Sequence, residues 1–161
     1  MIDIHEYEQI ASDSGAYKDI ELEILKETLV TADEHPGDPF HLVEIRDGRL
    51  LAGFAVFNKA SNTEFTYDGV AFCVDRGYLD KGIGQRLIEL VEESLLKLDR
   101  APILRFETSL KKQEAMGKGL LESCGFALIG HIADFYGAGD DYYIYARHLT
   151  PEGQPETGSE A

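Results

Sequence analysis

Hydrophobic residues recur at helical spacing in several segments of the chain. From Asp19 to Thr31, isoleucine and leucine occupy one face of the expected helix and charged residues the other. The same spacing runs from Gly82 to Leu98. A further helix is predicted from Gln113 to Ser123, because Gly125 follows it as a typical C-terminal cap. We expect the first forty residues to be helical, up to a break at residues 35–39.

Shorter apolar runs separated by turn residues predict strands. Segments Phe40 to Ile45 and Leu50 to Phe57 flank Asp47-Gly48, a dipeptide typical of tight hairpins. A third antiparallel strand is expected from Glu64 to Val74, after a polar turn. Further strands are predicted at Ile103–Thr108, Phe126–His131 and Tyr142–Leu149, with a loop at Asp134–Asp141.

The order of these elements predicts the class of fold. A strand–helix–strand unit follows an antiparallel meander, and such a unit requires one parallel pair of strands. We therefore expect an α/β fold with a mixed, mostly antiparallel central sheet and helices on both faces. A chain of 161 residues suits one core, so residues 1–149 are expected to form a single domain. Residues 150–161 are polar and acidic, and a disordered tail is expected there.

Charge and composition narrow the classes of partner. The chain has 30 acidic and 15 basic residues, a net charge of −15 that would repel DNA and anionic membranes. We therefore expect neither DNA nor a membrane as a partner. The negative field of the chain would attract a protonated amine; the alternative is that the charge only keeps the protein soluble. No apolar run approaches the ~20 residues of a membrane span and no signal peptide is evident, so a cytoplasmic location is expected. The two cysteines and five histidines lack metal-ligand spacing, so no metal is expected.

The segment between the third strand and the following helix contains the clearest candidate binding site. The first turn of a helix has unpaired N–H groups and a partial positive charge that suit a pyrophosphate, and glycine there removes an obstructing Cβ. Lys81 and Arg86 would add positive charge to an acidic protein. The alternative to a phosphate site is that the two glycines only ease a tight loop. The segment matches neither the nucleotide-binding P-loop nor the Rossmann fingerprint. The sequence of this candidate segment is Asp80-Lys81-Gly82-Ile83-Gly84-Gln85.

This segment resembles the acetyl-CoA signature of the GNAT N-acetyltransferase superfamily, whose consensus is Gln/Arg-x-x-Gly-x-Gly/Ala. Residues 122–126 are similar to the Tyr-Glu-x-x-Gly-Phe element of that family, and residues 134–141 resemble the loop before its last strand. The resemblance covers approximately His41 to Leu149. It implies the GNAT fold and acetyl-CoA as a co-substrate.

The resemblance also implies which residues bind the cofactor. Backbone groups of Phe72, Cys73 and Val74 would pair with the pantetheine arm in the manner of an added strand. The amides from Asp80 to Gln85 would hold the pyrophosphate. Ser109 would contact the cofactor or simply cap the turn before the next helix.

Transfer of an acetyl group to an amine requires a base, because an amine attacks only in its neutral form. By its place at the end of a strand, Glu107 is the first candidate, since a glutamate there acts as base in some members of the superfamily, and Asp68 is the second. The alternative is that both are solvated strand-end charges. Leu121 stands where the family often has the tyrosine that protonates the thiolate, and Tyr136 is a candidate substitute. Leu79 stands at the Gln/Arg position of the signature.

These patterns predict an N-acetyltransferase that uses acetyl-CoA and a primary amine of a small molecule or peptide. The two leucine departures leave an alternative, a catalytically weak or inactive acyl-CoA-binding sensor. A protein-interaction domain that ignores CoA is a further alternative. An exposed edge strand near the C-terminus would permit a homodimer.

Overall fold

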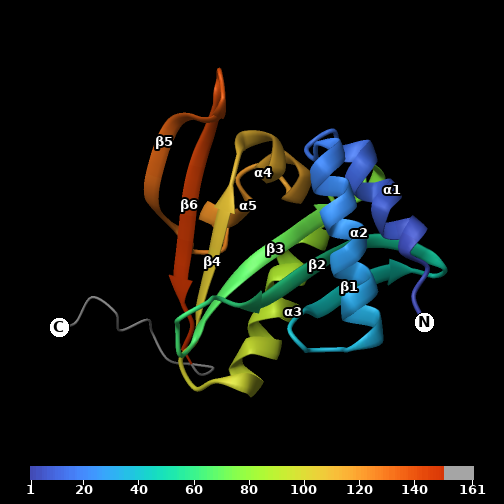
Figure 1. The fold of residues 1–161 in the computed structure, drawn as a ribbon, viewed down its shortest axis with the longest axis horizontal. Helices are drawn as coiled ribbons and strands as arrows, with labels where there is room; N and C mark the ends of the chain where they lie inside the picture. The colour runs from blue at the N-terminus through green and yellow to red at the C-terminus, as the bar shows by residue number, and fades with distance from the viewer. Residues whose placement is uncertain (151–161) are drawn as a thin grey trace.

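The computed structural model describes residues 1–150, and its centre is a six-stranded sheet with the order β1-β2-β3-β4-β6-β5 (Figure 1). β3 and β4 are parallel, and the other neighbouring pairs are antiparallel. This arrangement confirms the mixed, mostly antiparallel sheet. The predicted tail lies outside the described residues, apart from Thr150. The strands are β1 (His41–Asp47), β2 (Leu50–Lys59), β3 (Thr66–Val74), β4 (Ile103–Thr108), β5 (Ala127–Gly137) and β6 (Asp140–His148).

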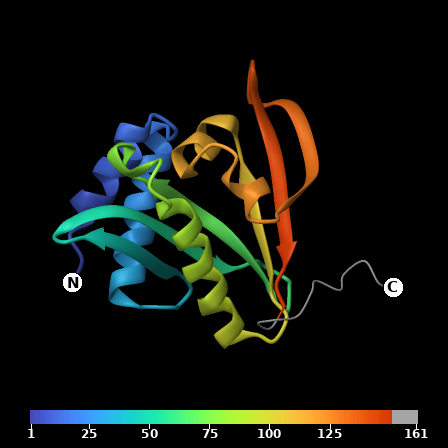
Figure 2. The ribbon, with the colours of Figure 1, turned by 180° about the vertical axis from the view of Figure 1, so that it is seen from behind.

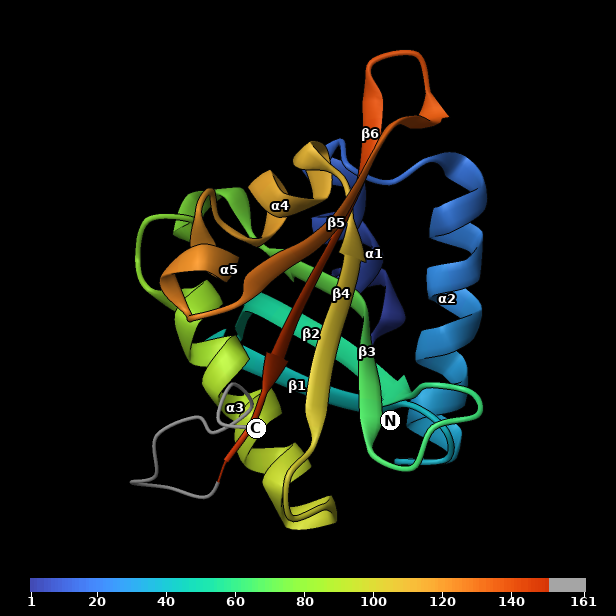
Figure 3. The ribbon, with the colours of Figure 1, turned by 90° about the vertical axis from the view of Figure 1, so that its left-hand side faces the viewer.

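Helices cover both faces of the sheet, as expected. In Figure 3, α1 and α2 lie on one side of the sheet and α3 and α5 on the other. Figure 2, which views the molecule from behind, shows α3 lying across the strands. Within residues 1–150, no helix has the length and apolar character needed to cross a membrane. The helices are α1 (Ile4–Ser14), α2 (Asp19–Glu34), α3 (Ile83–Leu98), α4 (Leu110–Met116) and α5 (Leu120–Ser123).

The alternation of side chains along β2 explains why two layers of helices form. Phe54 and Val56 are buried in the core that contains α1 and α2. Their neighbours Ala55 and Phe57 are buried in the core beneath α3. Because successive residues of a strand face opposite sides, a strand that is apolar at every position requires cover on both sides.

β3 and β4 pair only over a short stretch and then diverge (Figure 1). The last matched residues are Asp68 and Arg105. At Gly69 a Cβ would lie only 2.1 Å from a ring carbon of Phe106, so the aromatic ring occupies the point where the strands separate. We call the space beyond that point, along the unpaired edge of β3 as far as Val74, the β3 gap.

The helix predicted from Gln113 to Ser123 is wrong as a single element. The structure has two short helices, α4 and α5, with a break between them. Gly117 and Gly119 have φ values of +129° and +74°, which an α-helix cannot contain. The break lies beside the first turn of α3 and shapes the surroundings of the candidate site.

The loop predicted from Asp134 to Asp141 is also wrong, because β5 and β6 continue as a hairpin through most of it. Asp134 has a φ of +57°, and its N–H donates to the Asp141 carboxylate at 2.9 Å. The Gly139 N–H in turn donates to the Asp134 carboxylate at 2.8 Å. Short polar side chains that bond to nearby backbone therefore tie the hairpin together where the sequence suggests a loop.

Candidate functional site

The turn before α3, residues 75–85, presents free backbone amides at the start of a long helix; we call it the α3 turn. Gly82 is the N-cap in the left-handed conformation (φ +76°), and a Cβ there would meet nothing within 4 Å. The first helical bond runs from the Arg86 N–H to the Gly82 carbonyl at 3.1 Å. The N–H groups from Gly82 to Gln85 therefore have no intrahelical partner and suit a phosphate. The preceding Lys81 N–H is already used, since it donates to the Tyr78 carbonyl at 3.1 Å.

The two glycines of this turn are required for different reasons. Gly82 needs a positive φ and has open space beside it, which leaves the amides accessible. A Cβ on Gly84 would lie 2.6 Å from the Met116 carbonyl oxygen and 2.9 Å from the Leu120 side chain. Gly84 therefore allows α3 to pack against the break between α4 and α5, a packing role that the sequence pattern does not reveal.

The two cations predicted near the α3 turn have different surroundings. Arg86 forms ion pairs with Glu89 at 3.1 Å and Glu93 at 3.0 Å along the exposed face of α3, so its charge is shared with these carboxylates. The Lys81 ammonium lies 5.4 Å from the centre of the Tyr78 ring. Lys81 thus stays beside the turn, as expected.

Two other cations line a cavity of about 320 Å³ beside the α3 turn. They are Arg76 from the turn and Lys111 from α4, and neither forms an ion pair within the described part of the chain. Leu79, at the departed signature position, and Glu114 lie in the same lining. Arg76 lies three residues before Leu79, the first position of the signature, whereas no sequence motif identifies Lys111.

The free edge of β3 faces the β3 gap. The Asp75 N–H donates to the Ala52 carbonyl of β2 at 2.8 Å. This bond shows which residues of β3 direct their backbone N–H and C=O groups toward β2. Residues of an antiparallel strand alternate between facing and turning away from their neighbour. Phe72 and Val74 therefore direct their backbone groups into the gap, and Cys73 directs its own toward β2. Two of the three predicted backbone positions are thus free to pair with an extended ligand.

One side chain already contacts this edge. The Phe72 N–H donates to the hydroxyl of Tyr17, from the α1–α2 connection, at 3.4 Å. The Tyr17 hydroxyl also acts on the neighbouring Cys73 thiol, whose pKa it tends to lower. Burial raises the pKa of that thiol to about 12, which makes Cys73 a packing residue and not a nucleophile.

A second cavity, of about 280 Å³, lies next to the first; we call it the Tyr17 cavity. Its wall brings together the α1–α2 connection, α4 and the β5–β6 hairpin. Ser109 lies there as the N-cap of α4, and its hydroxyl accepts from the Lys112 N–H at 3.3 Å, so the structure gives it the capping role. The lining residues used below are Tyr17, Glu21, Ser109, Lys111, Lys112 and Tyr136.

An ion pair crosses this cavity wall from α2 to α4. The Lys112 ammonium donates to the Glu21 carboxylate and lies 5.3 Å from the ring centre of Tyr17 and 6.0 Å from that of Tyr136. Burial acts to raise the pKa of Glu21, but the hydrogen bonds from Lys112 and from the Lys18 N–H outweigh it and leave the pKa lowered. Sequence motifs gave no signal for Tyr17, Glu21 or Lys112, because the fold alone brings these segments together.

The two predicted bases have different surroundings. Asp68 uses both carboxylate oxygens on Arg105, at 2.6 and 2.9 Å. Glu107 accepts a hydrogen bond of 2.6 Å from the Tyr142 hydroxyl, and its other oxygen lies 3.9 Å from Arg105. The hydrogen bond to Glu107, followed by burial, raises the pKa of Tyr142 to about 12. Glu107 is about half-exposed and keeps an oxygen available.

Tyr136 lies at the end of β5 and lines the Tyr17 cavity. Its pKa is raised, first by burial and then by the charge of Glu107, which places these two predicted residues in the same surroundings. Its ring centre is 6.2 Å from that of Tyr142. Leu121, in contrast, is buried in the core beneath α3, so no polar group replaces the family tyrosine at that position.

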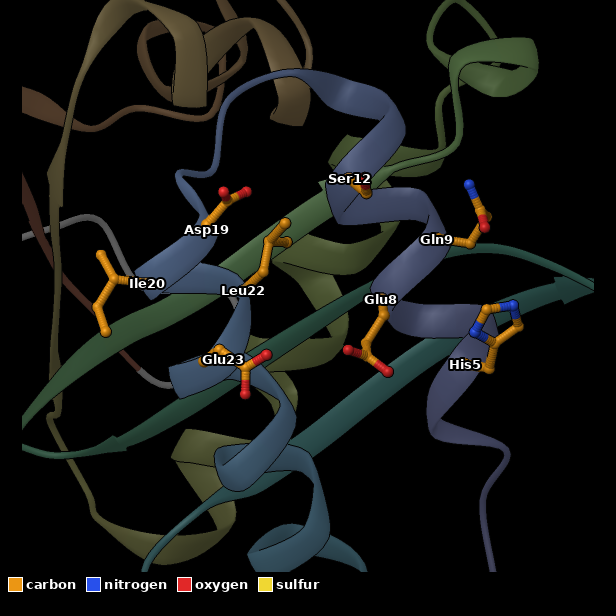
Figure 4. Close-up of a pocket in the computed structure, with 8 residues that line it drawn as sticks. All are labelled: His5, Glu8, Gln9, Ser12, Asp19, Ile20, Leu22 and Glu23. Atoms are coloured by element: carbon orange, nitrogen blue, oxygen red, sulfur yellow. The ribbon is translucent and has the colours of Figure 1, made fainter.

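An acidic groove of about 660 Å³ runs between α1 and α2 (Figure 4). Glu8 of α1 and Asp19 and Glu23 of α2 contribute carboxylates to it. Ile20 lines both this groove and the Tyr17 cavity, so the two adjoin. Within residues 1–150, no cluster of three His, Cys, Asp or Glu side chains has the geometry to hold a metal ion.

Comparison with known proteins identifies the family. The family model described as "Acetyltransferase (GNAT) family" matches residues 4–126. Among solved structures, a putative GNAT acetyltransferase from Desulfovibrio desulfuricans is 26% identical, with a TM-score of 0.78 over 90% of this chain and 91% of that chain. A search of curated protein sequences gives no significant match.

More distant structures share the fold. An aminoglycoside 6′-N-acetyltransferase complexed with coenzyme A is 14% identical, with a TM-score of 0.71 over 95% of this chain and 93% of that chain. A putative acetyltransferase from Salmonella typhimurium, solved with its cofactor acetyl-CoA, is 12% identical, with a TM-score of 0.70 over 96% and 95% of the two chains. The family model covers most of the chain, so this protein belongs to the GNAT acetyltransferase family, whose enzymes act with acetyl-CoA.

Proposed function

We propose that this enzyme transfers the acetyl group of acetyl-CoA to a primary amine of a small molecule or peptide by direct attack. The observation that supports this most is that the cavity beside the α3 turn and the Tyr17 cavity share Gly15 and Lys111 in their linings, so that they form a path past the end of β3 at Val74. Free amides lie at one end of this path, and Tyr136, whose pKa is raised in part by the charge of Glu107, lines the other.

The residues along this path fit acetyl-CoA. The amides from Gly82 to Gln85 would hold the pyrophosphate, with Arg76 and Lys111 adding charge from the adjacent cavity. The outward-facing backbone of Phe72 and Val74 would pair with the amides of the pantetheine arm. When bound, acetyl-CoA supplies the activated acyl group as a thioester.

We assign the role of general base to Glu107. An alkylamine has a pKa near ~10.4, so a base must remove its proton at neutral pH. Asp68 is the weaker candidate, because both of its oxygens accept from Arg105. The hydrogen bond from Tyr142 holds the Glu107 carboxylate in place and leaves its second oxygen for the amine or for a bridging water. A thiolate leaves with modest help, since a thiol titrates near ~8.5.

The charge distribution favours an acceptor that arrives as a cation. The acidic groove adjoins the Tyr17 cavity through Ile20, and the chain carries a net charge of −15. Such a field concentrates a protonated amine near the site. The expected cytoplasmic location stays a prediction.

We also propose a homodimer that pairs through β5, which is an edge strand of the sheet. Its exposed apolar side chains are Leu128, Ile129, Ile132 and Phe135. Light scattering during gel filtration would report the mass: a dimer is expected, and a monomer at micromolar concentration would contradict this assignment.

A catalytically weak or inactive acyl-CoA-binding module is the second candidate. The buried Leu121 favours it, because the residue cannot protonate a leaving thiolate. Leu79, exposed beside the α3 turn, removes a polar contact that the signature usually supplies. Both candidates require acetyl-CoA to bind, and they differ only in turnover.

A thermal melt with acetyl-CoA, followed by an assay of thiol release with a panel of amines, separates these functions. A ligand at a hundred times its dissociation constant adds ~2.7 kcal/mol of stability, which is a readable rise in melting temperature. Stabilisation together with amine-dependent thiol release supports the transferase. Stabilisation without turnover supports the sensor, and no stabilisation contradicts both.

A further inference from the structure

We propose that the hydroxyl of Tyr17 donates a hydrogen bond to the acyl carbonyl oxygen of acetyl-CoA, beside the Phe72 N–H at the edge of β3. This inference rests on the proposed function and adds a catalytic residue from outside the family signature. The two donors would together stabilise the negative charge that develops on this oxygen during attack.

The first argument is the position of the hydroxyl. It lies 3.4 Å from the Phe72 nitrogen, whose N–H points into the β3 gap and away from β2. An N–H at the edge of a sheet needs an acceptor, and the Tyr17 oxygen supplies one. A carbonyl oxygen that enters the gap at this point takes over the N–H and meets the phenol at the same place.

The second argument is that Tyr17 is held rigidly. Its aromatic ring packs against the core beneath α1 and α2, and the Lys112 ammonium lies 5.3 Å from its centre. Lys112 is itself fixed by its ion pair with Glu21. A donor fixed before the reaction stabilises a developing charge without reorganising during it.

The third argument is the protonation state of the phenol. Burial, with a further contribution from the nearby Cys73 thiol, raises the pKa of Tyr17 well above its ordinary value. Tyr17 therefore keeps its proton throughout the working pH range and acts as a hydrogen-bond donor. A phenol this weakly acidic does not give its proton to a thiolate that titrates near ~8.5.

The reaction step balances with these groups. Glu107 first takes the proton of the ammonium and releases it to solvent. The neutral amine nitrogen then forms a bond to the thioester carbon while the carbonyl oxygen, held by Tyr17 and Phe72, becomes negative. Glu107, ionised again, accepts the second proton that the nitrogen loses. The carbonyl then re-forms, the carbon–sulfur bond breaks, and the CoA thiolate leaves with the electron pair and takes a proton from solvent. Tyr17 is unchanged at the end.

This role differs from that of the family tyrosine, whose position is occupied by Leu121. Leu121 is buried and apolar, so the enzyme has no donor there for the reacting thioester. Tyr17 reaches the β3 gap from the opposite side of the fold, from the connection between α1 and α2. A donor to the carbonyl lowers the barrier to attack by the amine, whereas a proton donor to sulfur would assist the later cleavage of the carbon–sulfur bond.

Infrared spectroscopy with carbonyl-¹³C acetyl-CoA tests this proposal without requiring turnover. Hydrogen bonding lowers the carbonyl stretching frequency, so the bound ligand should absorb at lower wavenumber than the free ligand. Tyr17→Phe should lose much of this shift, and Tyr67→Phe should keep it. Tyr67 is a matched control because its buried hydroxyl binds Asp99, on the paired part of β3 and away from the gap. In the amine assay, Tyr17→Phe should lower kcat by about 10²-fold, the usual cost of one lost oxyanion donor.

The outcomes separate this proposal from the proposed function. If acetyl-CoA binds but no amine is acetylated, the infrared shift still decides the role of Tyr17. If acetyl-CoA does not stabilise the wild type, both proposals are overturned. An unshifted carbonyl in the wild type, or a shift and kcat that Tyr17→Phe leaves unchanged, would overturn the role of Tyr17 alone. The unshifted wild-type carbonyl would overturn this role even if the variant does not fold.

Discussion

The α3 turn and the Tyr17 cavity present different kinds of group to a ligand. The turn uses backbone amides from one continuous stretch, Gly82 to Gln85, set by a glycine in a left-handed conformation. The cavity uses side chains from the α1–α2 connection, α4 and the end of β5, such as Tyr17, Lys112 and Tyr136. The first arrangement is local in sequence, and the second exists only after the whole sheet has formed.

This difference predicts how each region responds to change. Backbone amides do not titrate, and no substitution other than proline removes one, so the glycines are the positions at which to disturb the turn. In the proposed function, catalysis depends on single side chains, and removal of each is expected to have little effect on cofactor binding. Variants of the two regions should therefore separate binding from turnover.

The largest effect is expected from Glu107→Gln. Loss of a general base lowers the rate by about 10²–10⁴-fold, while the amide keeps the shape of the side chain and a partner for Tyr142. Stabilisation by acetyl-CoA should be unchanged. Steady-state kinetics with the best amine of the panel, together with thermal melts, measure both quantities.

The matched variant is Asp68→Asn, in the other predicted base. It removes a charge from the pair with Arg105 and should lower stability more than it lowers kcat. A normal rate in Glu107→Gln with a large loss of rate in Asp68→Asn would reverse our assignment of the base.

The next largest effect is expected from Gly82→Glu in the α3 turn. The new carboxylate enters the open space beside the free amides and repels the pyrophosphate. The ~2.7 kcal/mol of stabilisation expected at a hundredfold excess over the dissociation constant should therefore disappear. Gly82→Ala is the control, because it adds a left-handed strain of ~1–2 kcal/mol without charge. If Gly82→Glu is stabilised by acetyl-CoA as strongly as Gly82→Ala, the pyrophosphate lies elsewhere.

The sequence predicted the α3 turn, which is formed by one continuous segment, better than the Tyr17 cavity, which is formed by several distant segments. The α3 turn could be recognised because a strand, two glycines and a helix follow one another directly, and β2 was evident from its continuous apolar run. The roles of Gly84 and Tyr17 could not be predicted, since each depends on a contact with a distant segment. The sequence did identify Glu107, but its hydrogen bond with Tyr142 depends on the pairing of β4 with β6.

A moderate effect on folding is expected from Gly84→Ala. The added methyl group would overlap the Met116 carbonyl oxygen, at 2.6 Å, and the Leu120 side chain. Overpacking of this kind costs ~1–3 kcal/mol of the free energy of unfolding. Urea denaturation measures this loss, and acetyl-CoA should still stabilise the remaining folded protein because the amides stay free. A variant as stable as the wild type would show that α3 and the α4–α5 break can move apart freely.

The smallest effect is expected from Glu21→Gln, and it depends on pH. The folded-state pKa of Glu21 is lowered, so its pair with Lys112 contributes stability that is present above the unfolded pKa and is lost as pH falls through the folded one. The melting temperature of the wild type should exceed that of Glu21→Gln at pH 7, and the difference should shrink as the pH falls below about 4.5. The pair is partly exposed, so its contribution should stay below ~1 kcal/mol. Glu23→Gln, on the same helix but facing the acidic groove, is the control, because it removes the same charge and leaves the pair with Lys112 intact. An equal loss in both variants at every pH would mean that general charge, and not this pair, holds the wall of the Tyr17 cavity.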